Sequence, residues 1–382
     1  MKKILIIATV VKTHINVFHL PYIKMFKEYG FETTVAAKND CDGGVVDIPN
    51  CDKYVDIPFS RNPFSPQNFK AYRMLKKLMD EEKYDIVQCN TPIGGAVGRL
   101  EVGRKHSGTK VFYIAHGFHF FEGSSLLSWL VYYPIEKMLS YVTDVLVTVN
   151  REDYERAKKK FRAKKTVLVD GIGCDLEKIE NSHPDRDAVR AKYGIKKDDL
   201  ALISVGELRK LKNHEAIIRA MAKLKRDDLH YFIAGSGLLR YKLLAAAEEL
   251  GVRDKVHLLG YCYNVFDYLK CSDIFCFPST REGLPVSLME AMAVGLPAVV
   301  SDVRGNRDLI TPEKGGFLYS PNDADGFAEG IEKLAENPAL REEMGSYNRE
   351  YIKKCDIKIV KETFSKIYFS NEKTIAEEQK TR

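Results

Sequence analysis

The most constraining feature of this 382-residue chain is a regular alternation of short, continuously apolar runs with longer amphipathic stretches. The first half contains runs of this kind at residues 2–10, 33–38, 84–90, 110–117, 144–150 and 166–171. A second series follows at residues 200–207, 230–235, 255–260, 273–279, 297–302 and 316–320. Continuously apolar runs that alternate with helices are typical of parallel strands covered on both faces. The sequence therefore predicts an α/β protein with two doubly wound, Rossmann-like halves.

A polar, charged segment around residues 177–199 separates the two series. We therefore expect an N-terminal domain at residues 1–180 and a C-terminal domain at residues 181–355. The stretch from about residue 356 to 370 is predicted to be a helix that packs back on the first domain, and the polar residues after it are expected to be frayed. Two doubly wound halves joined by a linker would bind a ligand between them, facing the carboxyl ends of the strands.

The bulk composition excludes several classes of protein. Hydrophobic residues make up 45% and charged residues 29% of the chain, which argues against a disordered or fibrous protein. The net charge of +6 is small against 59 basic and 53 acidic residues. This balance is compatible with anionic ligands or an anionic membrane surface, but it is too weak to indicate nucleic-acid binding.

The cysteines and the N-terminus indicate a cytoplasmic protein. The eight cysteines form neither a C-x-x-C pair nor a zinc-type cluster, and Cys89 and Cys276 lie inside apolar runs, so we expect buried free thiols in a reducing compartment. The first apolar run ends at Lys12 without a small-residue cleavage site, which favours a strand over a signal peptide. No stretch approaches the roughly 20 apolar residues that span a bilayer.

The most informative pattern is in residues 273–302. A predicted buried strand ends at Pro278, a loop follows, and a helix begins near Pro285, a residue favoured at the first helical position. Unpaired backbone N–H groups and the dipole at such a helix start favour the binding of phosphate. Two carboxylates, Glu282 in the loop and Glu290 in the helix, flank that position with seven residues between them.

This segment resembles the E-x7-E element of retaining glycosyltransferases with the GT-B fold, and its S-x-x-E-G-x-P…E-A-x-A-x-G-x-P frame is similar to family 4. The resemblance covers about residues 3–365 and implies two Rossmann-like domains facing a central cleft. It implies that Glu290 accepts hydrogen bonds from the nucleotide ribose and that Glu282 contacts the donor sugar. The main chain of Gly283 and Leu284 would donate to the diphosphate.

A second motif, S-V-G-E-L-R-K-L-K-N-H, occupies residues 204–214. In family 4 the corresponding loop supplies an arginine and a lysine to the leaving diphosphate. Lys212 and Asn213 match that pattern, but Glu207 stands at the usual arginine position, so Arg209 becomes the candidate for this role. The alternative is a solvated basic loop without a ligand.

A third motif, Y-I-A-H-G-F-H-F-F, occupies residues 113–121. His116 follows a predicted strand, and the resemblance implies that it lies beside the donor sugar; a purely structural histidine is the alternative. On the nucleotide side, Gly235 and Gly237 form a G-x-G between a strand and a helix, and Tyr261 is a candidate for the wall of the base site.

Two further segments are candidates for acceptor binding. The glycine-rich turn that relatives have after the first strand is missing, and Thr13, His14 and Asn16 are candidates for lining the acceptor or phosphate edge there, with an ordinary loop as the alternative. Residues 124–141 combine the single tryptophan with tyrosines and leucines. They predict either an interfacial helix that meets lipid-linked acceptors or a packed helix, and Pro134 weakens both interpretations.

The predicted chemistry needs no cofactor and no metal ion, because no D-x-D stands in the loop setting of a metal-dependent sugar transferase. Lys212, Arg209 and the helix start would instead neutralise the departing diphosphate. The resemblance implies transfer with retention, from a UDP-hexose or UDP-N-acetylhexosamine to a glycan or a polyprenyl-diphosphate-linked acceptor. Its details are similar to those of capsule and exopolysaccharide enzymes. Two alternatives stay open, a UDP-sugar 2-epimerase of the same fold and a non-catalytic nucleotide-sugar-binding subunit.

Overall fold

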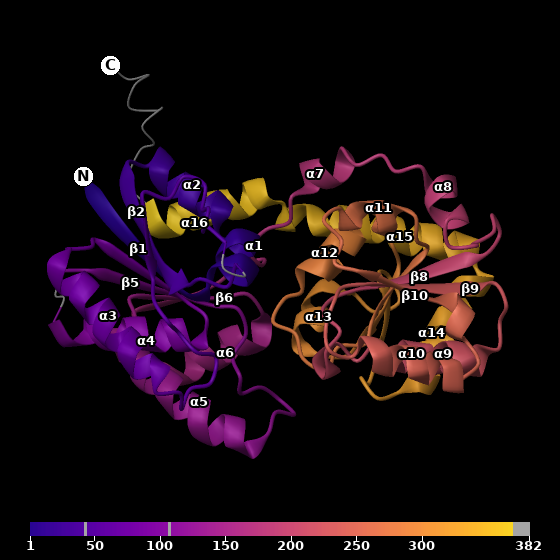
Figure 1. The fold of residues 1–382 in the computed structure, drawn as a ribbon, viewed down its shortest axis with the longest axis horizontal. Helices are drawn as coiled ribbons and strands as arrows, with labels where there is room; N and C mark the ends of the chain where they lie inside the picture. Colours follow the sequence, from indigo (N-terminus) through magenta and orange to yellow (C-terminus); the bar gives the residue numbers. More distant parts are fainter. Residues whose placement is uncertain (42–43, 106–107, 370–382) are drawn as a thin grey trace. The chain divides into compact units, whose positions relative to one another are not determined.

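The computed structural model describes residues 1–41, 44–105 and 108–369, and the chain forms two compact units (Figure 1). Of the described residues, unit 1 contains those in Met1–Ile172 and from Val360 to Phe369, and unit 2 contains Gly173–Ile359. The sequence analysis put the boundary after residue 180 and the returning helix at about 356–370. In the structure, helix α16 (Ile357–Phe369) begins in unit 2 and continues into unit 1. Residue 370 lies outside the described residues.

Unit 1 is built on a seven-stranded sheet in the order β3-β2-β1-β4-β5-β6-β7, in which all pairs are parallel. Its strands are β1 (Lys2–Val10), β2 (Phe31–Lys38), β3 (Lys53–Asp56), β4 (Ile86–Asn90), β5 (Lys110–Ala115), β6 (Val145–Thr148) and β7 (Lys165–Leu168). The sequence analysis did not include β3. This four-residue edge strand has charged ends and no fully buried residue, so it lacks the apolar run that identified the others.

The helices of unit 1 are η1 (Val11–Ile15, a π-helix), α1 (Asn16–Phe18), α2 (Leu20–Glu28), α3 (Gln67–Glu81), α4 (Pro92–Lys105), α5 (Leu126–Leu139), η2 (Ser140–Val142) and α6 (Arg151–Lys160). Helix α16 completes this unit, where it lies beside α2 (Figure 1). Its Tyr368 ring stacks on Phe112 with centroids 4.1 Å apart, and its hydroxyl donates to Gln88 Oε1 at 2.8 Å. Helix α16 is therefore part of the hydrophobic core of unit 1.

Unit 2 is built on a parallel six-stranded sheet in the order β10-β9-β8-β11-β12-β13. Its strands are β8 (Leu200–Val205), β9 (Leu229–Ala234), β10 (Val256–Gly260), β11 (Ile274–Phe277), β12 (Ala298–Ser301) and β13 (Gly316–Tyr319). Its helices are α7 (Leu176–Glu180), α8 (Arg186–Ala191), η3 (Lys210–Lys212), α9 (Glu215–Leu224), α10 (Arg240–Glu249), η4 (Arg253–Lys255), α11 (Val265–Lys270), α12 (Val286–Ala293), α13 (Arg304–Leu309), α14 (Ala324–Glu336), α15 (Pro338–Ile352) and η5 (Lys353–Cys355).

Successive strand residues in unit 2 belong to two different cores, one on each face of the sheet. Leu202 packs in one cluster and Ile203 in the other, and Phe275 and Cys276 divide in the same way. Successive side chains of a strand point to opposite faces, so a strand buried on both faces must be apolar throughout. This requirement explains the continuous apolar runs and confirms the predicted α/β fold class.

Each sheet reverses its strand order at one point. In unit 1 the reversal lies between β1 and β4, and in unit 2 it lies between β8 and β11. In open α/β sheets, ligands bind outside the carboxyl ends of the strands at such a reversal, because the connections diverge and leave a crevice. Among the residues that the structure describes, no helix has both the length and the apolar character needed to cross a bilayer.

Candidate functional site

The reversal point of unit 2 holds a lysine–glutamate pair. Lys212 ends the turn η3 after β8, and Glu282 lies in the loop after the adjacent strand β11. Lys212 Nζ donates to Glu282 Oε1 at 2.8 Å and also lies 4.6 Å from the centroid of the Phe277 ring. The two charged side chains are only 20% and 12% exposed. Two sequence motifs that are distant in the chain therefore meet at one place.

Backbone contacts fix the loop that carries Glu282. The amide of Thr280 donates to the carbonyl of Leu211 at 2.8 Å. This hydrogen bond connects the loop of Glu282 to the loop after β8 that carries Lys212, called the lysine loop below. Arg304, at the start of α13, donates from Nε to the main-chain oxygen of Glu282 at 2.9 Å. A Cβ atom on Gly305 would stand 2.4 Å from the carbonyl oxygen of Gly283, so this close approach requires glycine. Arg304 was not predicted from the sequence, although it follows β12, the strand next to β11.

Helix α12 presents the second carboxylate of the motif. Pro285 is its N-cap and Val286 its first residue, so Glu290 lies just over one turn into the helix. Glu290 keeps some surface exposure, but protein surrounds its carboxyl group, and this desolvation raises its pKa to about 7. The charge of Lys178 acts in the opposite direction on that pKa. A carboxyl group whose pKa is raised to near neutral pH by burial is typical of a functional position.

The predicted G-x-G packs directly on the loop after β8. A Cβ atom on Gly235 would stand 1.9 Å from the carbonyl oxygen of Gly206, and one on Gly237 would stand 2.7 Å from that of Leu208. Backbone approaches this close exclude any side chain. The two glycines therefore allow the backbone after β9 to pack directly against the loop that carries Lys212.

Arg209 and Tyr261 are predicted residues of unit 2 whose side chains are exposed. Arg209 forms an ion pair with Glu207, the residue that the family resemblance places at the usual arginine position. Tyr261 is 70% exposed, and its ring meets that of Tyr263 edge-on at a centroid distance of 5.1 Å. Neither side chain is fixed by burial, so their contacts with a ligand stay predictions.

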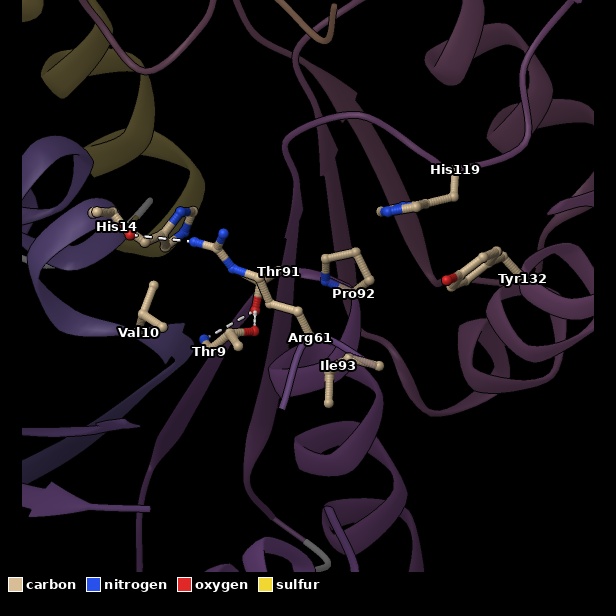
Figure 2. A pocket seen from close by; sticks show the side chains of 10 residues that line it. Thr9, Val10, His14, Arg61, Thr91, Pro92, Ile93, His119 and Tyr132 are labelled. Carbon is tan, nitrogen blue, oxygen red and sulfur yellow. Dashed lines mark hydrogen bonds between the residues drawn. The ribbon is translucent and has the colours of Figure 1, made fainter. Parts of the chain in front are cut away.

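The reversal point of unit 1 holds a pocket of about 190 Å³ (Figure 2). It is lined by Thr9, Val10, Thr13, His14, Arg61, Thr91, Pro92, Ile93, His119 and Tyr132. Arg61 donates to the hydroxyl of Thr13 at 3.3 Å, and the hydroxyls of Thr9 and Thr91 lie 2.7 Å apart. A cation, several hydroxyls and the start of α4 therefore surround one cavity, a combination that suits an anionic or polyhydroxylated ligand.

Two of the three predicted acceptor-side residues, Thr13 and His14, line this pocket. Asn16 instead begins α1, and its Nδ2 atom donates to the carbonyl of Asp47 at 3.4 Å. Arg61 and Tyr132 were not predicted. A sequence signal for Arg61 is absent, because it lies far from β1 and β4 in the chain and only folding brings it to them.

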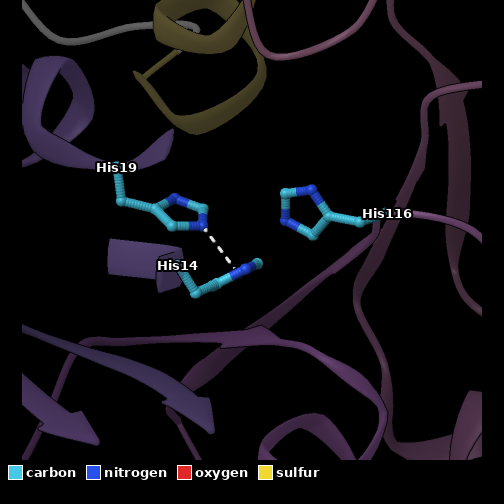
Figure 3. A group of neighbouring side chains, drawn as sticks. All are labelled: His14, His19 and His116. Carbon is cyan, nitrogen blue, oxygen red and sulfur yellow. Dashed lines mark hydrogen bonds between the residues drawn. The ribbon is translucent and has the colours of Figure 1, made fainter. Parts of the chain in front are cut away.

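His116 belongs to a cluster of three imidazole rings with His14 and His19 (Figure 3). Ring centroids are 4.7 Å apart for His14 and His116 and 5.5 Å apart for His19 and His116. Burial lowers the pKa of His116 to about 4, and it lowers the pKa values of the other two rings in the same direction. The sequence analysis treated His116 and His14 separately and did not identify His19.

Helix α5 (Leu126–Leu139) has two apolar faces. On its inner face Trp129 and Tyr133 pack against the core of unit 1. On its outer face Leu127 and Leu130 are 70% and 75% exposed. The exposed stripe continues through Pro134, Met138 and Tyr141, at the three- and four-residue spacing of one helix face. The inner face fits the prediction of a packed helix, and the exposed outer face fits the prediction of an interfacial helix.

Two protein-family models match the chain. Residues 185–351 match the model described as glycosyl transferases group 1, and residues 23–176 match the model described as glycosyltransferase family 4. EpsD of Bacillus subtilis (strain 168), to which a glycosyltransferase activity is ascribed, is 41% identical over 355 residues, which cover 91% of each chain. An Escherichia coli UDP-Gal:alpha-D-GlcNAc-diphosphoundecaprenol alpha-1,3-galactosyltransferase is 30% identical over 73% of this chain and 74% of its own.

Solved glycosyltransferase structures share the fold of this chain. Sucrose-phosphate synthase from Thermosynechococcus elongatus superposes with a TM-score of 0.81 at 18% identity, covering 97% of this chain and 99% of that one. Anabaena HepE in complex with UDP and glucose gives a TM-score of 0.80 at 17% identity, over 97% and 100% of the two chains. The GT-B architecture expected from the sequence is therefore confirmed.

Proposed function

Because this chain belongs to glycosyltransferase family 4, we propose that it moves a sugar from a UDP-sugar to a lipid-linked glycan with retention of anomeric configuration. The donor sugar is a hexose or an N-acetylhexosamine. The product is an intermediate in the synthesis of a cell-surface polysaccharide.

The observation that carries this proposal is the Lys212–Glu282 pair at the reversal point of unit 2. A departing diphosphate develops negative charge, and a lysine fixed beside the reacting group stabilises that charge without reorganisation. Glu282 holds the lysine in position and offers an acceptor oxygen to a sugar hydroxyl. The carboxylate form of Glu290 accepts from the ribose, and the main chain of Gly283 and Leu284 donates to the diphosphate.

The reaction proceeds by attack on the face from which the diphosphate departs. The bond between the anomeric carbon and the diphosphate oxygen breaks, and a bond from the acceptor hydroxyl oxygen to that carbon forms. The hydroxyl proton passes to the departing phosphate oxygen. Lys212, Arg209 and the start of α12 neutralise the UDP product, and His116 contacts the donor sugar. No cofactor or metal ion takes part in this step.

Uridine is proposed as the base because of two relatives. The Escherichia coli relative is named for UDP-Gal, and the Anabaena structure contains UDP and glucose. The G-x-G at Gly235 and Gly237 supports the loop that holds Lys212, and the exposed ring of Tyr261 is available to stack on a base.

The acceptor is proposed to bind in the pocket of unit 1. The name of the Escherichia coli relative specifies a diphosphoundecaprenol-linked sugar, and a Campylobacter jejuni relative is named for a diphospho-undecaprenol acceptor too. Such an acceptor combines hydroxyls with a diphosphate, and the pocket offers Arg61 together with the hydroxyls of Thr9, Thr13 and Thr91. Arg61 is the group best suited to the charge.

Peripheral contact with the inner face of the cell membrane follows from a lipid-linked acceptor. The outer face of α5 supports this part of the proposal, because an exposed apolar stripe can insert into the boundary between headgroups and acyl chains. The helix also exposes Lys137, a cation suited to anionic lipid. The enzyme would then act from the cytoplasm at the membrane surface.

The decisive experiment incubates the purified protein with UDP-glucose, UDP-galactose, UDP-GlcNAc or UDP-GalNAc, each with and without polyprenyl-diphosphate-linked sugars. We expect UDP release that requires acceptor and a product with an α-linkage, detected by mass spectrometry and NMR. Inverted stereochemistry would contradict the retaining mechanism.

The two alternatives give different outcomes in the same experiment. Conversion of UDP-GlcNAc without acceptor would identify a 2-epimerase. Binding of a UDP-sugar without turnover under any acceptor would identify a non-catalytic subunit. Each would overturn the transferase proposal.

A further inference from the structure

The three histidines of unit 1 converge although they come from different segments. His14 lies in η1, His19 precedes α2, and His116 follows β5. Their nearest ring nitrogens all lie within 4.8 Å of one another (Figure 3). His14 Nε2 and His19 Nε2 are 3.2 Å apart. Two nitrogens bound to one tetrahedral zinc ion at about 2.0–2.1 Å each would be separated by nearly this distance.

The hydrogen bonds of the cluster are incomplete. His116 Nε2 and His19 Nδ1 are buried and have no hydrogen-bond partner in the structure. His19 is fully inaccessible to solvent. Buried polar nitrogens are normally satisfied, because leaving one unpaired destabilises the fold. His14 Nε2 and His19 Nε2 form a hydrogen bond with each other. The buried, unpaired nitrogen of His116 beside this pair favours a missing ligand that accepts a lone pair from each ring.

We infer that His14, His19 and His116 form a binding site for one divalent transition-metal ion of the zinc type. Imidazole nitrogen is a preferred ligand of such ions, and three histidines with a fourth position left to water is an established zinc geometry. Magnesium prefers oxygen ligands and does not fit this set. Because His14 also lines the pocket of unit 1, the pocket gives an ion a path to the cluster.

A neighbouring cation affects the strength of the site. Arg61 acts on His14 through its charge and disfavours a second cation there. Replacing Arg61 with glutamine should therefore tighten metal binding, because this repulsion is removed.

Metal binding and catalysis compete for one side chain under the function proposed above. An ion held by His116 uses a ring nitrogen that the proposed donor-sugar contact also needs. The site is therefore inhibitory, and added zinc is expected to lower the rate of sugar transfer. The ion is not the neutralising group for the diphosphate, which is assigned to Lys212.

The test is a titration of the metal-free protein with Co²⁺, followed by its visible absorption, and with Zn²⁺, followed by calorimetry. We expect one equivalent of either ion, a tetrahedral cobalt spectrum, and no response to Mg²⁺. The variant His19→Gln should weaken binding by about tenfold or more. The variant His19→Cys should keep cobalt and add a thiolate-to-cobalt absorption band, which shows that residue 19 binds the ion directly.

The matched control is His257→Gln, because His257 Nε2 lies 3.2 Å from His230 Nδ1 in unit 2 and forms the other close histidine pair among the described residues. This variant should bind cobalt like the wild type. Absence of stoichiometric binding by the wild type, or unchanged binding by His19→Gln, would overturn the inference. Loss of cobalt binding in His257→Gln would also overturn the inference, because it would show that the ion binds in unit 2. These spectra do not depend on turnover, so they separate this inference from the proposed transferase function.

Discussion

Lys212 Nζ and Glu282 Oε1 lie 2.8 Å apart, on loops that follow the adjacent strands β8 and β11. Each group satisfies the charge of the other, and the aromatic face of Phe277 covers the lysine. A pair of this kind keeps both side chains in one rotamer before a ligand arrives. Under the proposed function, the lysine therefore needs little rearrangement to meet a departing diphosphate.

The first prediction concerns the charge of Lys212. The substitution Lys212→Met keeps a long unbranched side chain and removes its charge, so transition-state stabilisation should be lost. We expect kcat to fall by about 10²–10³-fold, which is typical for one lost donor to a developing anion. Steady-state kinetics with the preferred UDP-sugar measures this effect.

A neighbouring lysine provides the control for this substitution. Lys210 lies in the same turn η3 but is exposed, and Lys210→Met should change kcat by less than about twofold, because an exposed charge is largely screened. Equal losses in the two variants would show that only the net charge of the loop matters.

The second prediction concerns the pH dependence of nucleotide binding. Under the proposed function, ribose hydroxyls donate to the ionised form of Glu290, and burial raises the pKa of this group to about 7 in the free protein. Affinity for UDP should therefore fall as the pH drops below 7, by about tenfold per pH unit. The variant Glu290→Gln removes this component, and the dependence that remains belongs to the phosphate of the ligand. Calorimetric titrations at several pH values distinguish the two.

The same pKa shift predicts a stability effect without ligand. The pKa of Glu290 is raised from 4.5 to about 7 on folding, so the unfolded state loses its proton first as the pH rises. The shift therefore opposes folding progressively between these two values. Glu290→Gln should unfold at a higher temperature than the wild type at pH 8 and at a similar temperature at pH 4. A variant that is less stable at pH 8 would contradict this expectation.

The third prediction concerns the glycine that supports the lysine loop. The Cβ atom in Gly235→Ala would collide with the carbonyl oxygen of Gly206, which must move. We expect a loss of about 1–3 kcal/mol in the free energy of unfolding, as for other overpacked sites, together with weaker UDP binding. In Gly251→Ala the Cβ atom meets nothing within 4 Å, and the cost is only the strain of a positive φ angle, about 1 kcal/mol, with UDP binding unchanged. Similar UDP affinities in the two variants would argue against a role of the G-x-G in shaping the site.

The fourth prediction concerns the outer face of α5. The substitution Leu130→Glu places a charge in the middle of the exposed apolar stripe and should weaken binding to vesicles that contain anionic lipid. Burial of a leucine side chain is worth about 1.5–3 kcal/mol, so the partition coefficient should fall by about tenfold or more. Vesicle sedimentation measures it. Leu238→Glu is the control, because Leu238 is 96% exposed in unit 2 and should have no effect. Equal vesicle binding by the wild type and Leu130→Glu would show that α5 does not contact the membrane.

The sequence alone was sufficient for the fold class because the burial of a parallel sheet on both faces leaves a continuous apolar signature. Six strands of unit 2 and six of the seven in unit 1 carry that signature. Strand β3 does not, since an edge strand with partly exposed residues needs no continuous apolar run. The motifs that contain Lys212, Glu282 and Glu290 are local in the sequence, so the resemblance to family 4 could point to these residues, and their roles stay predictions.

The tertiary structure alone decided which of these residues meet. The contact of Lys212 with Glu282 depends on β8 lying beside β11, although β9 and β10 intervene in the chain. The convergence of His19 with His116, and of Arg61 with Thr13, likewise joins segments that local patterns cannot relate. The local hydrophobic pattern determines whether a segment forms a strand or a helix, because it reflects which side chains of that one element are buried. Pairing between elements depends on sheet order and on close backbone approach, which only the folded chain supplies.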